Sequence, residues 1–478
     1  MNQPSNTALQ PVIVGAGPAG IRAAQTLAAH GARSVLIDEA ARGGGQIYRR
    51  PPAHFVRPAA TLYGTEASRA TAVHAALDKL QSQIDYQPDS LVWNAQGGLL
   101  DVLHGPTQTT HTVPYGQLIV ASGATDRVLP VPGWTLPGVY TLGGAQVALK
   151  FQGCAIGSRV VLMGTGPLLY LVAYQYAKAG AAVAAVLDTA RFVDQLAALP
   201  AMLTQPAVFA KGVYYVAWLR AHGVPIHSGV RPVRVLGDAR VAGVVWTDGA
   251  EREHTLDCDA VGFGYALRSE TQLADLLGCR FAWAPLHRAH LPERDALGRS
   301  SVQGVYLAGD GAGIMGADAA EWAGELAALA LLQDHGVAID AARLQTLQRQ
   351  LSHLMRFRHG LERAFPFPAD WATHAPDALV VCRCENVTAG ELRTCVRDTG
   401  ADEMNRLKAL TRVGMGRCQG RTCGVAAAEL LAQACGKPVE RVGRLRGQAP
   451  IKPIPINLPT RPAADISADP AASAGATA

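Results

Sequence analysis

Short apolar runs alternate with helix-like stretches through the first two thirds of the chain. Residues 11–15 predict a buried strand, Ile21–His30 predict a helix, and residues 34–37 predict the next strand. The same strand–helix–strand order recurs from Arg159 onward. Because parallel strands need a helical crossover between them, this order predicts an α/β fold of the Rossmann-like type.

Two more apolar runs and one long amphipathic stretch complete the pattern. Residues 117–121 and 305–308 predict buried strands. Leucines recur mostly at three- and four-residue steps from Leu344 to Phe365, which predicts an amphipathic helix, and Pro366 is expected to stop it. The chain therefore consists of an α/β part followed by a part of different composition.

Composition narrows the class of protein. The 478 residues exceed what one core can organise and predict two to four domains. The net charge is only +5, and Lys and Arg do not gather in runs with aromatic residues, so nucleic acid is not expected as a partner. No signal peptide and no apolar run of about eighteen residues is visible, so we expect no transmembrane segment. The expected location is the cytoplasm, either free or peripheral to the inner membrane.

The first strand ends in a glycine motif, GAGPAG, at residues 15–20. Its three glycines permit the tight turn, the approach of backbone amides to a pyrophosphate, and close packing of the helix on the strand. The helix N-terminus that follows favours an anion. Asp38 and Glu39 follow the next strand, where one carboxylate is expected to accept hydrogen bonds from a ribose diol. This combined context predicts a dinucleotide site.

A later strand ends at Gly309 and Asp310, which supplies a carboxylate of the kind that a flavin's ribityl chain needs. Together with the GGQ at 44–46 and the ASG at 121–123, these motifs resemble the two-dinucleotide-domain flavoprotein family over residues 9 to about 330. The resemblance implies that these segments hold FAD. The residues expected to contact it are Gly15, Ala16, Gly17, Pro18, Ala19, Gly20, Asp38, Glu39, Gly45, Gln46, Ala121, Ser122, Gly123, Gly309 and Asp310.

The second glycine motif is degenerate. Gly164 and Gly166 match the first two glycines, but Leu169 stands where the third belongs. A leucine there blocks the close approach of helix and strand that glycine allows. Asp188 lies one step beyond the position expected for the ribose-binding acid. The pattern favours a retained scaffold that no longer uses NAD(P)H, and whether it binds NAD(P), another nucleotide or nothing stays open.

Four cysteines near the end of the chain form a C-x-C and a C-x4-C pair: Cys382, Cys384, Cys418 and Cys423. Two thiolate pairs from separate turns can enclose an iron–sulfur centre, and we favour a [2Fe–2S] cluster over zinc because zinc sites more often use C-x2-C knuckles. A further alternative is that the four cysteines are buried by coincidence and bind no metal.

Arginines surround these cysteines and would stabilise an anionic cluster: Arg383, Arg412, Arg417 and Arg421. The segment from Val381 to Cys423 resembles the bacterioferritin-associated-ferredoxin-like [2Fe–2S] domain. Stand-alone members of that family usually close with C-x2-C, whereas this chain has C-x4-C. The C-x4-C spacing is similar to that of versions fused to flavoproteins.

The motifs divide the chain into consecutive parts. The expected domains are the first part of an FAD-binding domain (9–156), an inserted, degenerate NAD(P)-like domain (157–263), the second part of the FAD-binding domain (264–336), a helical linker (337–375), a small helical [2Fe–2S] domain (376–440) and an extended or disordered tail (441–478).

This order of domains resembles one group, the α-type subunits of heteromeric FAD-dependent amino-acid dehydrogenases. The group includes the opine oxidase A subunit, the hydrogen cyanide synthase B subunit and the D-hydroxyproline dehydrogenase α subunit. The resemblance implies an electron-transfer subunit that carries FAD and a [2Fe–2S] cluster. It also implies a partner subunit with its own FAD, similar to D-amino-acid oxidases, which oxidises the C–N bond of an opine, amino or imino acid. Electrons would pass to a quinone or another acceptor.

No catalytic constellation stands out in the chain, and catalytic residues are left unassigned. A protein rich in cofactor motifs but poor in catalytic groups fits an electron-transfer subunit. Two alternatives remain. One is a self-contained NAD(P)H-dependent reductase, against which Leu169 argues; the other is a non-enzymatic iron–sulfur binding module, against which the complete first glycine motif argues.

Overall fold

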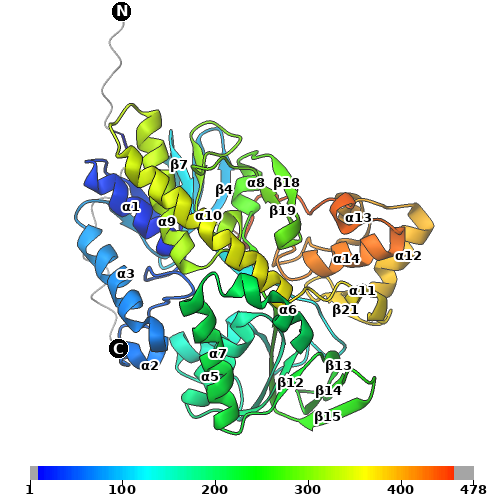
Figure 1. Cartoon of the computed structure of the whole chain (residues 1–478). Coiled ribbons are helices and arrows are strands. Elements are labelled where there is room, and N and C mark those ends of the chain that lie inside the picture. Colours follow the sequence, from blue (N-terminus) through cyan, green and yellow to red (C-terminus); the bar gives the residue numbers. More distant parts are fainter. Residues whose placement is uncertain (1–8, 457–478) are drawn as a thin grey trace, which may run out of the picture.

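The computed structural model describes residues 9–456 of the chain (Figure 1). Two nucleotide-domain sheets lie one above the other, and the cysteine-bearing part packs beside both (Figure 1). The expected α/β architecture with parallel sheets is therefore confirmed. The expectation of a disordered end falls on residues 457–478, outside the described range.

The first domain is built on a five-stranded parallel sheet in the order β20-β7-β1-β2-β3. Its strands are β1 (Val12–Val14), β2 (Val35–Ile37), β3 (Asp85–Gln87), β7 (Leu118–Val120) and β20 (Val305–Leu307). Strand residues alternate between two cores: Ile13 faces the helices, and Val12 faces a three-stranded sheet. The helices on one face are α1 (Pro18–Ala29), α2 (Ala59–Tyr63), α3 (Ala67–Leu80) and α9 (Ala317–Asp334), and the strands on the other are β4 (Ser90–Gln96), β5 (Leu99–His104) and β6 (Thr109–Pro114).

The second domain repeats the plan with the order β12-β11-β10-β16-β9, again all parallel. Its strands are β9 (Val139–Thr141), β10 (Arg159–Thr165), β11 (Ala182–Asp188), β12 (Ile226–Ser228) and β16 (Ala260–Tyr265), and its helices are α4 (Leu142–Val147), α5 (Pro167–Lys178), α6 (Phe192–Met202) and α7 (Pro206–Ala221). An antiparallel sheet adds β13 (Arg231–Leu236), β14 (Gly243–Thr247) and β15 (Glu253–Asp257).

The expected start of this domain at residue 157 is too late. Strand β9 and helix α4 precede that boundary, yet β9 pairs with β16 in the second sheet. The sequence placed the boundary at the next glycine motif, because β9 is only three residues long and carries no periodic signal.

Two short antiparallel strands carry the chain between the domains. Strand β8 (Ala124–Asp126) leaves the first domain directly after β7, and β17 (Leu267–Ser269) returns from the second. The return continues through α8 (Gln272–Leu276), β18 (Phe281–Ala284) and β19 (Ala289–Pro292). Residues near 124 and 268 are thereby held side by side although they lie far apart in the sequence.

The amphipathic helix expected between Leu344 and Phe365 is confirmed as α10 (Ala341–Ala364), which ends before Pro366. It crosses the front of the molecule from the first domain to the second (Figure 1). Leu354 and Phe357 pack together with Ala319 of α9 and with Met202 of α6. The expected helical linker therefore clamps the two nucleotide domains together.

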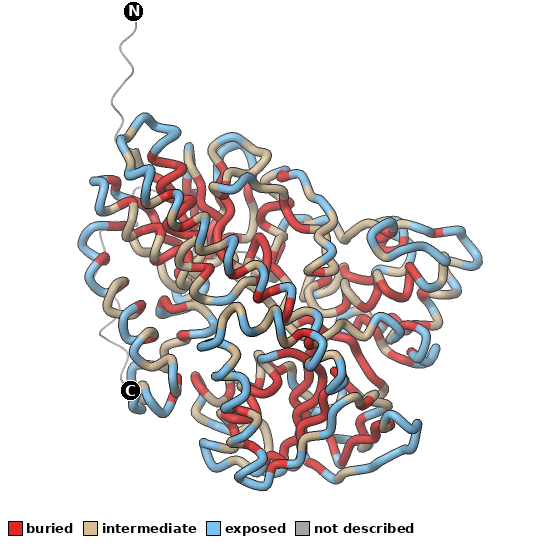
Figure 2. The backbone as a smooth tube through the Cα atoms, in the orientation of Figure 1, coloured by how far each residue is buried: buried red, intermediate tan, exposed pale blue. Residues whose placement is uncertain are grey.

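The cysteine-bearing part, which we term the cysteine module (residues 376–440), is mainly helical. It contains β21 (Val380–Cys382), β22 (Val387–Thr388), α12 (Ala389–Thr399), α13 (Met404–Thr411) and α14 (Gly424–Cys435), and α11 (Trp371–His374) precedes it. The Trp134 indole donates to the Val380 carbonyl at 2.7 Å, and the Trp371 indole donates to the Pro130 carbonyl at 2.9 Å. The buried residues of the cysteine module form one continuous core with those of the second domain (Figure 2).

The segment after the module does not simply lie extended on the surface. Ile451 is only 4% exposed, and its N–H donates to the Trp93 carbonyl of β4 at 3.0 Å. We term residues 444–452 the strap, because they run from the module back to the first domain. No helix among residues 9–456 is long and apolar enough to cross a bilayer.

The contact between α1 and α9 leaves no room at Gly324, where a Cβ would overlap the Ala19 backbone carbonyl. We expect Gly324→Ala to force these helices apart and to lower the free energy of unfolding by about 1–3 kcal/mol. Thermal or urea unfolding of the purified variant measures this.

Gly212 of α7 provides a matched control, because a Cβ there would meet nothing within 4 Å. Gly212→Ala should leave stability unchanged or raise it by about 0.5–1 kcal/mol through higher helix propensity. Equal stability of the two alanine variants would contradict the close packing of α1 on α9.

Candidate functional site

The first glycine turn has the geometry of a nucleotide site. Gly15 has φ +107°, and a Cβ there would overlap the Ala121 carbonyl oxygen. A Cβ at Gly20 would likewise overlap the Gly15 carbonyl oxygen. Gly17 caps α1 without a side-chain hydrogen bond, and no acidic residue lies in the first helical turn. The N–H groups at this helix end therefore remain available to an anion.

The GGQ loop lies directly against this turn. The Gly44 N–H donates to the Ala16 carbonyl at 2.8 Å. A Cβ at Gly45 would lie 3.0 Å from Gly17 Cα, so the two backbones approach closely. The Gln46 side-chain oxygen accepts two hydrogen bonds from Arg49, at 2.8 and 3.2 Å. The structure thus brings the predicted residues of 15–20 and 44–46 together.

Asp38 and Glu39 take different roles. The two Asp38 oxygens accept from the Ala16 N–H at 2.5 Å and from the Ala40 N–H at 2.7 Å. Burial raises the pKa of Asp38 above its usual value, and these two backbone bonds oppose the rise. Glu39 forms an ion pair with Lys452 of the strap. Asp38 therefore shapes the turn, which leaves Glu39 as the carboxylate better placed for a ribose.

The remaining predicted contact residues converge on the same edge of the sheet. The Ser122 hydroxyl donates to the Glu270 carbonyl at 2.6 Å, and the Glu270 N–H donates to the Gly123 carbonyl at 2.9 Å. Asp310 Oδ1 accepts from the Met315 and Gly316 N–H groups at 2.8 and 3.1 Å.

These features fit a dinucleotide. Bare glycine backbone, an uncapped helix end and the carboxylates Glu39 and Asp310 lie at one edge of the parallel sheet, formed by the carboxyl ends of the strands. Asp310 Oδ2 has no hydrogen-bond partner among residues 9–456 and is free for a ligand.

The second glycine turn is closed by its own side chains. Leu169 is fully buried in the core of this domain. The neighbouring Tyr170 hydroxyl donates to Asp188 Oδ2 at 2.6 Å, and the Ala190 N–H donates to Asp188 Oδ1 at 2.9 Å. Burial raises the pKa of Asp188 to about 6. Both carboxylate oxygens of Asp188, the acid expected to bind a ribose, therefore already accept hydrogen bonds from within the protein.

The four predicted cysteines come together from two loops of the cysteine module. The Cys423 thiol contacts the sulfurs of Cys382 and Cys418, and Cys418 also contacts Cys384. Cys382 and Cys423 are buried, whereas Cys384 is exposed. The hydrogen bond from Cys423 lowers the pKa of Cys382 to about 6 and that of Cys418 to about 4, which favours thiolates at these two positions.

Four sulfurs in pairwise contact are a donor set that suits a two-iron cluster. Within residues 9–456, no three or more His, Cys, Asp or Glu side chains are arranged so that they could hold a single metal ion. The four sulfurs match the two-iron hypothesis in ligand type and number.

The predicted ring of arginines is only partly present. Arg412 pairs with Glu385 at 2.7 Å, and Arg383 stacks on Trp134 with 5.5 Å between the guanidinium carbon and the ring centre. Arg417 is exposed. Arg421 points inward and pairs with Glu270 at 2.7 Å.

Two charged residues near the cysteines escaped the sequence reasoning. Arg268 lies in β17 and Glu270 follows it, about 150 residues before the cysteine pair that they approach. Arg268 Nη1 donates to the Gly420 and Arg421 carbonyls at 3.4 and 3.2 Å. Charged residues at the end of an otherwise apolar strand were the only available signal.

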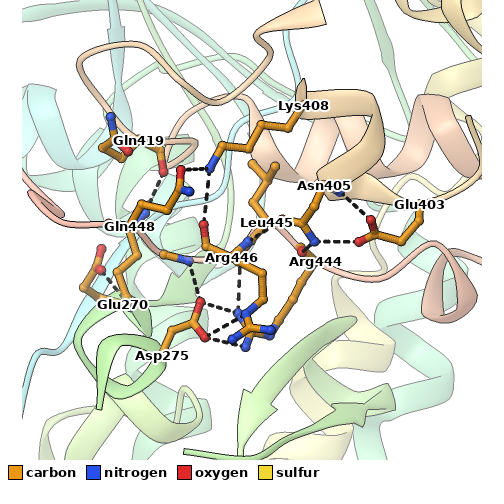
Figure 3. A network of polar contacts seen from close by, with 12 residues as sticks. Glu270, Asp275, Glu403, Asn405, Lys408, Gln419, Arg444, Leu445, Arg446 and Gln448 are labelled. Atoms are coloured by element: carbon orange, nitrogen blue, oxygen red, sulfur yellow. Dashed lines mark hydrogen bonds and ion pairs between the residues drawn. The ribbon is translucent and has the colours of Figure 1, made fainter. Parts of the chain in front are cut away.

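The strap covers the cysteine loops. A Cβ at Gly414 or Gly420 would lie 2.7 or 2.5 Å from Leu445, so these glycines make room for the leucine side chain. Asp275 of α8 accepts from both terminal nitrogens of Arg444 at 2.7 Å (Figure 3). The strap therefore packs an apolar side chain against the glycines of the cysteine loops and ties these loops to the first domain.

Two known domain families match the chain. The pyridine nucleotide-disulphide oxidoreductase family matches residues 9–324, and the BFD-like [2Fe-2S] binding domain matches residues 380–433. The second match contains all four cysteines. These matches confirm the two resemblances drawn from the glycine and cysteine motifs.

Relatives are similar over nearly the whole chain. The opine oxidase A subunit of Rhizobium meliloti is 37% identical over 461 residues, which cover 93% of this chain and 85% of that protein. The hydrogen cyanide synthase subunit HcnB of Pseudomonas protegens is 36% identical over 462 residues, which cover 94% of this chain and 97% of that protein.

Solved structures share the fold. L-proline dehydrogenase from P. horikoshii superposes with a TM-score of 0.70 at 19% identity, over 95% of this chain and 79% of that chain. Thioredoxin reductase from T. acidophilum superposes with a TM-score of 0.50 at 22% identity, over 68% of this chain and 98% of that chain. At these identities the likeness concerns the fold alone.

If the four sulfurs are ligands, loss of one should release the cluster. We expect Cys384→Ser to reduce bound iron to a small fraction of the wild-type content, because serine is a much poorer ligand for iron–sulfur centres. Iron analysis and visible absorption measure this. Cys395→Ser is the control, since Cys395 bonds only within α12 to Thr399. Full iron content in Cys384→Ser would exclude Cys384 from the ligand set.

Asp188 predicts a pH effect on stability. Its folded pKa of about 6 lies above the ordinary 3.8, so the folded chain holds this proton more tightly than the unfolded chain. Stability should therefore fall as pH rises from about 4 to 7, by roughly 2 kcal/mol from this group. Asp188→Asn should remove that part of the fall, as measured by urea unfolding across the range. A pH-independent difference between the two proteins would contradict the buried Asp188–Tyr170 pair.

Proposed function

The chain belongs to the pyridine nucleotide-disulphide oxidoreductase family, and within it to the group of opine oxidase A subunits and their relatives, and we propose that it is the electron-transfer subunit of a heteromeric dehydrogenase. It carries FAD in the first domain and a [2Fe–2S] cluster in the cysteine module. A partner subunit oxidises the C–N bond of an opine, amino or imino acid, and electrons leave to a quinone or another acceptor.

One observation carries the proposal. Glu270 contacts both predicted cofactor sites: its backbone bonds to Ser122 and Gly123, and its carboxylate pairs with Arg421 of the cysteine loop. A single residue thus separates the segment expected to contact flavin from the loop expected to hold the cluster. When bound, the flavin supplies two-electron chemistry and the cluster one-electron transfer.

Residues of this chain bind both cofactors. The glycine turn at 15–20 and the free N–H groups of α1 bind the pyrophosphate, and Glu39 and Asp310 accept hydrogen bonds from the sugar-derived hydroxyls. The four cysteines ligate iron, and Leu445 excludes water from the enclosed side of the loop.

The names of the two relatives support a partner subunit. Each is named as one subunit of an oxidase or synthase, so this chain also acts within a heteromeric complex. We assign substrate oxidation to a second chain that resembles D-amino-acid oxidases and carries its own FAD. Catalytic residues of the C–N oxidation are accordingly assigned to that partner.

The alternative of a self-contained NAD(P)H reductase is disfavoured by Asp188, because Tyr170 occupies the carboxylate that a ribose would need. The alternative of a non-enzymatic iron–sulfur module is disfavoured by the intact first nucleotide site, which such a module would not need.

We expect the purified chain to show flavin and cluster absorption that NADH does not bleach under anaerobic conditions. Dithionite should bleach both chromophores, which controls for reducibility. Addition of an opine together with the partner subunit should then bleach them as well. Rapid bleaching by NADH, or turnover of an opine by the chain alone, would overturn the proposal.

A further inference from the structure

A buried charge cluster joins the two predicted cofactor sites. We term Arg268, Glu270 and Arg421 the clasp. Glu270 accepts from Arg421 Nε at 2.7 Å and from Nη2 at 3.1 Å, and the two side chains are 10% and 13% exposed. Removing both charged groups from water costs free energy, which is recovered only when the two side chains meet in one relative position. The clasp therefore fixes where the cysteine loop lies.

The clasp contains two arginines and one carboxylate, so the positive charge of Arg268 has no carboxylate of its own. Among residues 9–456 it forms no ion pair of its own, and its closest carboxylate, Glu270, is already held by Arg421. Two guanidinium groups therefore share one carboxylate, which leaves a net positive charge. Arg268 Nη1 donates to the carbonyls of Gly420 and Arg421, so the cation lies against the loop that joins Cys418 to Cys423. Burial lowers the pKa of Arg268, and these two cysteines oppose the fall.

The opposite side of the clasp meets the flavin segment. Ser122 and Gly123 bond to the Glu270 backbone. A Cβ at Gly311 would lie 2.6 Å from the Ser122 hydroxyl and 3.5 Å from the Glu270 carbonyl oxygen. Segments 122–123, 270 and 311 are thus packed without intervening side chains.

Docking alone does not explain the clasp. Two other buried pairs hold the module and the strap to the first domain, Arg288–Glu429 at 2.7 Å and Arg444–Asp275 at 2.7 Å. Among residues 9–456, the arginines of those pairs form no hydrogen bond to the loop between Cys418 and Cys423. Arg268 donates to the Gly420 and Arg421 carbonyls of that loop, and this contact distinguishes the clasp from both.

We propose that Arg268 and Glu270 are positioning residues that hold the cysteine loop against the flavin segment and set the reduction potential of the cluster. The inference rests on the proposed function. Reduction of a cluster adds one electron and one negative charge beside Arg268. Arg268 therefore favours the reduced state, and Glu270 opposes it.

The test is a redox titration of the full chain, with the reduced cluster followed by electron paramagnetic resonance. Arg268→Gln should lower the reduction equilibrium constant at least about tenfold, which is about 59 mV toward negative potential for one electron. Glu270→Gln keeps its shape and backbone bonds but loses its charge, and should shift the potential in the opposite direction. Opposite shifts are a readout that a merely structural role would not give.

Glu429→Gln is the matched control, because it removes the charge of a buried Glu–Arg pair whose arginine, among residues 9–456, forms no hydrogen bond to the cysteine loop. Its cluster potential should equal that of the wild type. Potentials in Arg268→Gln and Glu270→Gln that equal the wild type, or that shift in the same direction, would overturn the inference.

The outcomes separate this inference from the proposed function. A wild-type chain without flavin or without a cluster signal contradicts the proposed function itself. A wild-type chain with both signals and insensitive variants contradicts only the role of the clasp. If Glu270→Gln fails to fold, Arg268→Gln carries the test alone, and an unchanged or more positive potential in it overturns the inference.

Discussion

A carboxylate taken out of water must meet a cation in one fixed position, and this constraint organises the junction of the molecule. Breaking such a buried pair by removing one partner costs about 3–5 kcal/mol, although its net contribution to stability is small. The pairs therefore specify geometry more than they add stability. Three of them fix the cysteine module and the strap: Glu270–Arg421, Asp275–Arg444 and Glu429–Arg288. These pairs fix the position of the cysteine loops relative to the glycine turn of the first domain.

The strap extends this constraint to the nucleotide site. Leu445 fills the space that glycines leave beside the cysteine loop, and Asp275 holds the backbone that follows (Figure 3). The segment then places the Ile451 carbonyl against Arg421 and Lys452 against Glu39. One short segment thus touches the cysteine loop, the clasp and Glu39 at the carboxyl end of β2. The need to make room for Leu445 explains Gly414 and Gly420 of the cysteine loop.

Sequence patterns predicted those features of the fold that depend on neighbouring residues in the chain. The strands, the crossover helices, the glycine turn and α10 follow from apolar periodicity and from backbone positions that exclude a Cβ, such as Gly20. The pairing of β9 with the second sheet has no such signal, because long-range pairing decides it. The pairing of Glu270 with Arg421, across 151 residues, is equally invisible to a local pattern. The spacing of the four cysteines was informative because their chemistry is rare, whereas arginines such as Arg383 turn outward as readily as inward.

Asp188 shows how one contact changes the interpretation of a motif. By position it is one step from a ribose-binding acid, yet Tyr170 turns it into an internal acceptor, and Leu169 fills the space of the missing glycine. The second domain also has a structural role. Here its core continues into the cysteine module, and the Trp134 indole donates to the strand that leads to Cys382. The second domain therefore forms part of the support on which the cysteine loops are held.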